Sequence, residues 1–275
     1  MPDPSPALAA FAIVTRLRAA GCVFAEDEAR LLITAAATPS DLAAMVERRA
    51  AGLPLEYVIG WAEFCGLHIA VEPGVFVPRH RTELLVRQAA ARARPGAVVV
   101  DLCCGAGALG AALAASLGRI ELHATDIDPA AVRCARLNLA AAGGHVYEGD
   151  LYQPLPAGLR GRVDLLVANV PYVPTAEIAL LPREARLYEA RRALDGGGDG
   201  LDVLRRVAAE AAGWLVPGGH LLVETGAAQA PPAVEVFARG GLIPEVASLD
   251  ELEATVVIGT LDAAGSGSRG SPRRS

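Results

Sequence analysis

The chain has 275 residues, a formal net charge of −6 at pH 7 and 52% hydrophobic residues. This length and apolar content allow one large domain, or a medium domain plus a small one, around a sizeable core. Because proteins that grip duplex nucleic acid normally carry an excess of Lys and Arg, a nucleic-acid partner is not expected. No apolar run reaches the roughly 18 residues that a membrane span needs, and Met1–Gly21 lacks a basic start, so we expect a cytoplasmic protein without membrane association.

Cysteine and histidine usage argues against a metal centre. The five cysteines are odd in number and scattered: Cys22, Cys65, Cys103, Cys104 and Cys134. None forms a C-x-x-C pair with a matching His, and the histidines lack metal-ligand spacing, so the sequence predicts neither a disulfide framework nor a metal site. A reducing compartment fits this usage. No direct role is predicted for any histidine, and His80 comes nearest to one.

The N-terminal part predicts a small helical domain over residues 1–60. Residues 5–52 carry apolar side chains at helical spacing and predict three short helices. Pro6 suits a first turn and Gly21 a C-terminal stop, while Thr38 and the proline after it predict the start of a later helix. The stretch holds no cluster of catalytic side chains, so we expect a module that packs or docks a partner.

A linker is predicted over residues 61–78. Apolar residues there recur with a period near two on either side of Pro73–Gly74. This alternation predicts a β-hairpin that joins two domains.

Residues 79–262 predict an α/β domain with a Rossmann-like, seven-stranded sheet. The first five candidate strands are apolar and separated by helical segments, which predicts a parallel sheet covered on both faces. They are VVVDL (98–102), ELHATD (121–126), HVYEGD (145–150), DLLVAN (164–169) and HLLVET (220–225). The last two, 242–248 and 254–260, have a connection too short for anything but an antiparallel pair. Residues 263–275, rich in Gly, Ser and Arg, predict a disordered tail.

Ligands of open parallel sheets bind beyond the carboxyl ends of the strands, so the residues that follow each strand are the candidates for a site. The first candidate strand carries Asp101 near its end and leads into small residues that let the backbone turn tightly before a helix begins near Ala108. These residues are Cys103, Cys104, Gly105, Ala106 and Gly107. The glycines also match G-x-G-x-x-G, which keeps a nicotinamide dehydrogenase open at this point.

The next two strand ends also carry carboxylates. Asp126 ends the second strand, where it can accept hydrogen bonds from a ribose diol. Asp150 ends the third strand as a candidate acceptor for an exocyclic amine, and Leu151 beside it can pack on a purine face. Capping of a turn is an equally good explanation for Asp150 by itself.

The fourth strand end is the most specific: Asn169-Val170-Pro171-Tyr172. Asn169 supplies a side-chain carbonyl, and Val170 supplies a backbone carbonyl that the following proline biases toward an extended conformation. Two acceptors that converge can hold an NH2 group, and Tyr172 can stack on the planar group that carries it.

With these residues the chain resembles the HemK/PrmC family of protein-(glutamine-N5) methyltransferases, which modify the Gly-Gly-Gln loop of peptide-chain release factors. The resemblance runs from about Pro54 to Gln229. It rests on motifs in a fixed order: Glu56-Tyr57-Val58-Ile59-Gly60, Val77-Pro78-Arg79-x-x-Thr82-Glu83, the glycine loop, Asp126, Gly149-Asp150, Asn169-Val170-Pro171-Tyr172, and Tyr188-Glu189 through Gly200-Leu201-Asp202.

The resemblance implies a small helical domain followed by a seven-stranded methyltransferase domain. It implies S-adenosylmethionine as cofactor, contacted by residues 103–107, Asp126, Leu151 and Asn169, and a substrate glutamine held by residues 169–172. The partner would be a protein, most naturally a release factor.

Three departures from the family pattern suggest a divergent branch. Val170 stands where the family has proline, but the group used there is a main-chain carbonyl, and a β-branched residue still favours extended geometry. Cys103 and Cys104 replace Gly and Thr, and His80–Arg81 replaces Pro-Glu.

Other readings remain open from the residues themselves. One is methylation of another NH2 group, either glutamine in a ribosomal protein or an adenine amine in nucleic acid. Another is a cofactor-binding module that has lost activity. A dehydrogenase leaves the Asn-x-Pro-Tyr segment unexplained. Asp195–Gly200, rich in Gly and Asp, predicts either a mobile lid or a plain surface loop.

Overall fold

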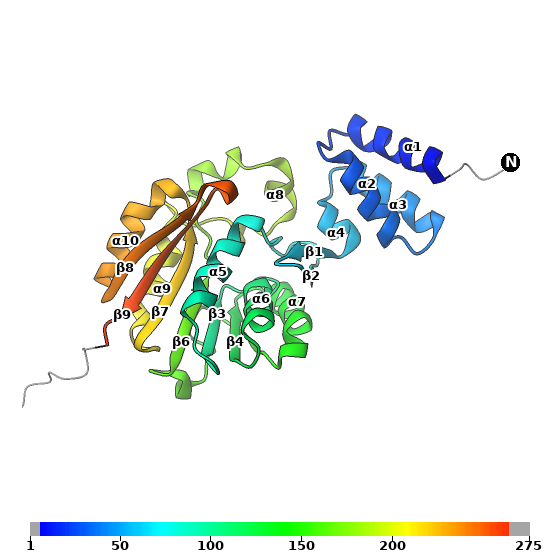
Figure 1. Ribbon diagram of the computed structural model, residues 1–275. Coiled ribbons are helices and arrows are strands. Elements are labelled where there is room, and N and C mark those ends of the chain that lie inside the picture. Colours follow the sequence, from blue (N-terminus) through cyan, green and yellow to red (C-terminus); the bar gives the residue numbers. More distant parts are fainter. Residues whose placement is uncertain (1–5, 264–275) are drawn as a thin grey trace, which may run out of the picture.

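The computed structural model describes residues 6–263 and shows a helical bundle beside a larger α/β domain (Figure 1). The bundle contains α1 (Pro6–Ala19), α2 (Ala25–Ala35), α3 (Pro39–Ala50) and the short α4 (Leu55–Ile59). The three predicted helices are therefore confirmed, and α4 was not predicted. Thr38 caps α3, because its hydroxyl accepts a hydrogen bond from the Asp41 N–H at 3.1 Å. Residues 264–275 of the predicted tail lie outside the described residues.

A hairpin does join the two parts, but its turn is not where the sequence predicted it. Strands β1 (Trp61–Phe64) and β2 (Leu67–Ala70) pair antiparallel around Cys65–Gly66. Both turn residues have positive φ, 50° and 72°, which is the geometry of a two-residue type I′ turn. Pro73–Gly74 lies beyond β2, so the apolar alternation up to Val77 marks burial rather than strand pairing.

The α/β domain is built on seven strands in the order β5-β4-β3-β6-β7-β9-β8. The strands are β3 (Val98–Leu102), β4 (Glu121–Asp126), β5 (His145–Glu148), β6 (Val163–Ala168), β7 (Leu215–Thr225), β8 (Leu242–Leu249) and β9 (Ala254–Leu261). The first five are parallel, and β9 runs antiparallel between β7 and β8. The predicted parallel sheet with a terminal hairpin is thus confirmed.

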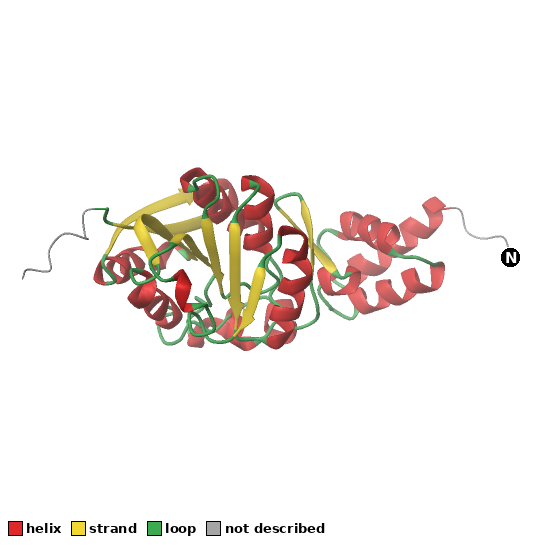
Figure 2. Cartoon of the chain, turned by 90° about the horizontal axis from the view of Figure 1, so that it is seen from below, coloured by secondary structure: helices red, strands yellow, loops and turns green. Residues whose placement is uncertain are grey.

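Helices cover both faces of this sheet (Figure 2). The α/β helices are α5 (Glu83–Arg92), α6 (Ala108–Leu117), α7 (Pro129–Leu139), α8 (Arg183–Tyr188), α9 (Asp202–Ala211) and α10 (Ala230–Arg239). The core alternates accordingly: Val99 packs with α5, α6 and α7 on one face, whereas Val98 and Val100 pack with α9 and α10 on the other. No helix in the described part of the chain is long and apolar enough to cross a membrane.

Candidate active site

One cavity of about 550 Å³ opens at the carboxyl ends of the parallel strands. Most of the residues singled out from the sequence lie on its wall. They are Cys103, Cys104, Gly105, Ala106, Asp126, Asp150, Leu151, Asn169, Val170, Pro171 and Tyr172. The fold therefore brings the predicted cofactor segments and the Asn-Val-Pro-Tyr segment into a single space, as expected for residues that follow neighbouring parallel strands.

The glycine loop follows β3 and turns sharply into α6. Cys103 and Gly105 have φ of 55° and 54°, and Gly107 has φ of 79° at the N-cap of α6. Positive φ is favoured by glycine, so the loop holds Cys103 in a conformation that L side chains adopt rarely. A side chain at Gly107 would also come within 3.2 Å of Ala135 in α7, so this glycine allows close helix packing.

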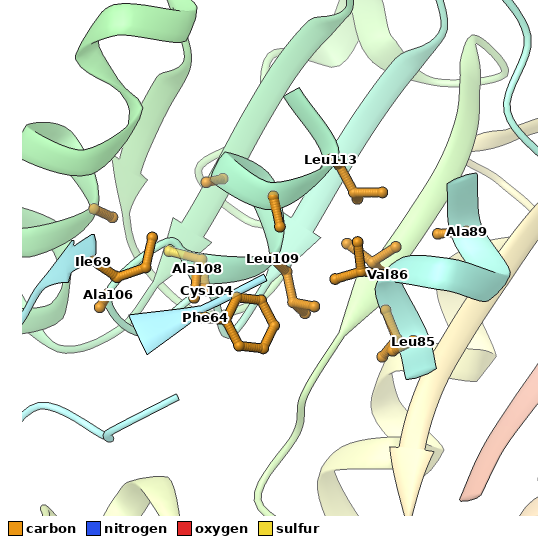
Figure 3. Close-up of a cluster of buried hydrophobic side chains, with 14 of the residues drawn as sticks. Phe64, Ile69, Leu85, Val86, Ala89, Cys104, Ala106, Ala108, Leu109 and Leu113 are labelled. Atoms are coloured by element: carbon orange, nitrogen blue, oxygen red, sulfur yellow. The ribbon is translucent and has the colours of Figure 1, made fainter. Parts of the chain in front are cut away.

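The loop rests on an apolar base. Cys104 and Ala106 are buried, and Figure 3 shows both among the sticks of one hydrophobic cluster that also contains Phe64, Ile69 and Leu109. Phe64 and Ile69 belong to the hairpin, so the linker packs directly beneath the predicted cofactor loop. The alternating apolar residues that predicted the hairpin thus support the site.

Asp126 is fixed by the backbone on both of its oxygens. Its Oδ2 accepts the Gly105 N–H and its Oδ1 accepts the Asp128 N–H, each at 2.8 Å. Burial raises the pKa of this carboxyl, and the two backbone donors oppose that rise. A carboxylate has about four lone-pair sites, so Asp126 retains acceptors for a diol in the cavity.

Ile127, directly after Asp126, was not singled out from the sequence. It lines the cavity and is 54% exposed, unusually open for a large aliphatic side chain. An exposed apolar surface inside a cavity suits the face of a planar ring. Its only sequence signal was its place next to Asp126.

Asp101 does not line the cavity, although it was predicted as a cofactor contact. It is fully buried, and its Oδ2 accepts the Gly110 N–H of α6 at 3.0 Å. Its side chain points to the same face of the sheet as Val99 and lies against α6, not beyond the end of the strand. Burial raises the pKa of this carboxyl to about 7. Gly107 is likewise outside the lining and acts through backbone geometry.

Asp150 and Leu151 form the wall beyond β5. Asp150 pairs with Arg206 of α9, Oδ2 to Nη2, at 2.5 Å. Leu151 is 7% exposed and has φ of 50°. Asp150 therefore lies on the cavity wall with its side chain paired to Arg206, and its contact with the cofactor stays a prediction.

Asn169 lies at the end of β6 and faces Thr82 across the cavity wall. Its Nδ2 donates to the Thr82 Oγ1 at 3.4 Å, which turns the Oδ1 acceptor away from Thr82. The side chain of Val170 is 2% exposed and packs in the core between the sheet and α9. Within residues 6–263 no backbone N–H donates to the Val170 carbonyl, so both predicted acceptors retain free lone pairs.

Tyr172 is held at both ends by residues that the sequence did not reveal. Its hydroxyl donates to Glu224 Oε1 at 3.0 Å, and its carbonyl accepts Gln229 Nε2 at 2.9 Å. The Arg81 guanidinium lies 5.8 Å from the centre of the ring. Burial and, secondarily, the charge of Glu224 raise the pKa of the phenol, so Tyr172 is a hydrogen-bond donor and not a base at neutral pH.

The loop Asp195–Gly200 supports this segment from behind. The Gly196 N–H donates to the Val173 carbonyl at 2.8 Å, and the Thr175 N–H donates to the Gly197 carbonyl at 2.9 Å. A side chain at Gly200 would come within 2.3 Å of the Tyr172 carbonyl oxygen. The loop therefore packs against the acceptor segment itself.

One wall of the cavity is tied to the helical bundle. Glu184 of α8 lines the cavity and accepts Arg49 Nη1 at 2.6 Å. Arg49 of α3 also pairs with Glu28 of α2, Nε to Oε2, at 2.6 Å. The Arg49 and Glu28 side chains are 8% and 11% exposed and Glu184 is 46% exposed, so this cluster is a partly buried joint between the bundle and the α/β domain. Only a tertiary contact between distant segments could have revealed it.

His80 is placed away from the chemistry. Its side chain is 71% exposed, pairs with Glu83 at 2.9 Å and does not line the cavity. Arg81 and Thr82, its neighbours on the same short turn, both line the cavity. Of the three residues on this turn, His80 is the one that does not line the cavity.

Comparisons with known proteins bear on the family and the fold. The model of the family described as methyltransferase small domain matches residues 66–209. A release factor glutamine methyltransferase of Geobacter sulfurreducens is 43% identical over 208 residues, which are 74% of this chain and 72% of the relative. One of Mycolicibacterium smegmatis is 39% identical over 231 residues, 82% of each chain.

A solved methyltransferase structure from Pyrococcus furiosus aligns with a TM-score of 0.54 at 17% identity, covering 72% of this chain and 90% of that chain. At that identity it supports the fold alone. The sequence identity to the release factor glutamine methyltransferases shows the family as well as the fold, because it extends over most of both chains. Together with the family match, it shows that this chain belongs to the release factor glutamine methyltransferase family, with a methyltransferase small domain.

Proposed function

We propose that this protein transfers a methyl group from S-adenosylmethionine to the side-chain amide nitrogen of a glutamine in a protein loop, the Gly-Gly-Gln loop of a release factor. The observation that carries the proposal is the orientation of Asn169. Thr82 takes its NH2 group, so its carbonyl oxygen is left to accept, on the same wall as the Val170 carbonyl and the Tyr172 ring. These groups match the hydrogens and the plane of a primary amide.

The other end of the cavity fits the cofactor. Asp126 would take the ribose hydroxyls, the backbone of the glycine loop would lie along the methionine part, and Ile127 and Leu151 would flank the adenine. The fit rests on the chemistry of the donor set: a carboxylate pinned by two backbone N–H groups, beside small residues and an exposed aliphatic side chain. When bound, S-adenosylmethionine supplies a methyl group made electrophilic by its sulfonium sulfur.

The Asn169 and Val170 carbonyls would help to overcome the low nucleophilicity of the substrate amide. An amide nitrogen is a poor nucleophile because its lone pair is delocalised into the carbonyl, and positive charge develops on nitrogen as the new bond forms. The Asn169 and Val170 carbonyls would accept both N–H groups, fix the direction of the nitrogen and stabilise that charge without reorganising. The alkylated amide is acidic enough to lose its proton to water, so the site needs no strong base.

The helical bundle would provide the remaining recognition. A primary amide is too small to distinguish one protein from another, so specificity requires contacts outside the cavity. The bundle is joined to the cavity wall through Arg49 and Glu184, so a partner bound to it would be held at a defined distance from the acceptor residues.

The test is incubation with labelled S-adenosylmethionine and three substrates in parallel: purified release factors, a ribosomal protein fraction and DNA. Peptide mass mapping should find one added methyl group on the Gly-Gly-Gln glutamine. Asn169→Ala should abolish most of the label, and His80→Ala should retain it. Label in a ribosomal protein would move the substrate to another glutamine, label only in nucleic acid would favour an adenine acceptor, and no label would leave a binding module.

A further inference from the structure

We infer that Glu224 and Arg81 are positioning residues that orient the Tyr172 ring over the acceptor amide. The inference rests on the proposed function, because it concerns side chains that act through the acceptor site. Glu224 lies near the end of β7 and is 1% exposed. Its Oε1 accepts both the Tyr172 hydroxyl, at 3.0 Å, and Arg81 Nε, at 3.1 Å.

The topology explains how Glu224 reaches Tyr172. Strands β6 and β7 are parallel neighbours with Ala168 beside Val223, so the residues that follow, Asn169 and Glu224, lie at the same edge of the sheet. Tyr172 comes three residues after Asn169 and folds back over this edge. The acceptor segment and its buried carboxylate are thus brought together by strand register, although they are far apart in the sequence.

Tyr172 is then constrained along its whole length. Gln229 holds its carbonyl at 2.9 Å, and Glu224 holds the far end of the ring through the hydroxyl. A tyrosine side chain has only two main torsions, so fixing both the backbone and the phenol oxygen leaves the ring plane little freedom. A face intended to stack on a planar amide gains from that rigidity, because misplacement of a reacting group lowers the rate steeply.

Arg81 places a positive charge beside this acceptor, because its Nε donates to Glu224 Oε1 at 3.1 Å. Hydrogen bonds in which donor or acceptor is ionised are stronger than those between neutral groups. Within residues 6–263 the second oxygen of Glu224 has no hydrogen-bond partner. The carboxylate therefore depends on Arg81 and Tyr172, and the Arg81 guanidinium also covers the tyrosine ring.

The same short turn serves both acceptor side chains. In His80–Thr82, Thr82 binds Asn169 directly and Arg81 reaches Tyr172 through Glu224.

The test is a double-mutant cycle on the full chain. Single-turnover rates, KM for the protein substrate and S-adenosylhomocysteine affinity are measured for Glu224→Leu, Tyr172→Phe and the double variant. Glu224→Leu and Tyr172→Phe should each lower the rate roughly tenfold, the lower end for a lost hydrogen bond to a charged group. KM and cofactor affinity should stay within about twofold, since docking and cofactor contacts lie elsewhere. His80→Ala is the control from the same turn.

The double variant should be no slower than the slower single variant, because both remove the same contact. Glu224→Gln, which preserves shape and an acceptor, should recover part of the rate, and Arg81→Leu/Glu224→Gln avoids an unpaired buried charge if a single variant folds poorly. Fully multiplicative losses, or unchanged rates, would overturn the inference.

A readout without turnover separates this inference from the proposed function. The 13C-tyrosine resonance of Tyr172, assigned with Tyr172→Phe, should shift in Glu224→Leu and stay in place in His80→Ala. If the parent protein methylates no glutamine but this shift appears, the proposed function is refuted and the positioning of the Tyr172 ring by Glu224 is supported. If the Tyr172 resonance does not shift in Glu224→Leu, the positioning of the ring by Glu224 is refuted, whatever the methylation activity of the variant.

Discussion

Replacing Asp126 with alanine should weaken cofactor binding by an amount that the structure bounds. Two of the four lone-pair sites of the carboxylate are occupied by the Gly105 and Asp128 N–H groups. The remaining sites are those expected to meet the ribose diol. A hydrogen bond to a charged group contributes about 1.5–3 kcal/mol, so Asp126→Ala should raise the Kd by roughly ten- to a hundredfold.

Calorimetry with S-adenosylhomocysteine measures this directly. Asp128→Asn is the matched control, since Asp128 caps α7 through the Ala130 N–H at 2.9 Å and asparagine caps as well as aspartate. Its affinity should stay within about twofold of the parent. A thermal unfolding curve of each apo variant shows whether loss of the two backbone contacts has disordered the loop. An Asp126→Ala variant that is stable and binds as tightly as the parent would refute the reasoning, as would tight NADH binding without any response to S-adenosylhomocysteine.

Three further predictions follow from buried groups and close contacts. The pKa of Asp101, raised by burial from 3.8 to about 7, means that the folded chain holds a proton which the unfolded chain releases; stability should therefore fall as pH rises from about 4 to 7, and Asp101→Asn should flatten this fall in thermal unfolding at pH 5 and 8. Val170→Pro should keep single-turnover activity within about tenfold, because residue 170 contributes a main-chain oxygen, whereas Asn169→Ala should lower it roughly a hundredfold. Gly200→Ala should reduce the rate by displacing the Tyr172 carbonyl, which a Cβ would approach to 2.3 Å, while Gly198→Ala, with open space around it, should not.

Much of the α/β domain could be predicted because its signals are local. The predicted bounds of β3 and β4 coincide with the observed ones, since buried parallel strands are short apolar runs that end in polar or small residues. The hairpin turn was placed wrongly because alternation of apolar residues records which side is buried, and burial continues to Val77 after pairing stops at Ala70. Gly66 was the local signal for the true turn.

The residues of the candidate site also fall into those that could be predicted from local sequence and those that could not. Residues that follow strands, such as Asp126 and Asn169, are fixed by topology and could be named in advance. The contacts of Glu224, Thr82 and Gln229 could not be predicted, because they join segments separated by tens of residues, and Thr82 was named only as part of a motif. Each is an ordinary polar residue in the sequence and becomes informative only when its partner is known.

Arg49 links the helical bundle to the cavity wall, and this contact has a consequence for chimeric proteins that exchange the bundle. A chimera that takes residues 1–60 from a relative would place Glu184 against a foreign surface, and would keep the joint only if an arginine arrives at the same place. Substitutions that adapt the bundle to a different partner must therefore keep Arg49, even if Arg49 does not contact that partner. In a grafted bundle with alanine at residue 49, Glu28 would lose its buried partner, whereas the half-exposed Glu184 would keep its contact with solvent.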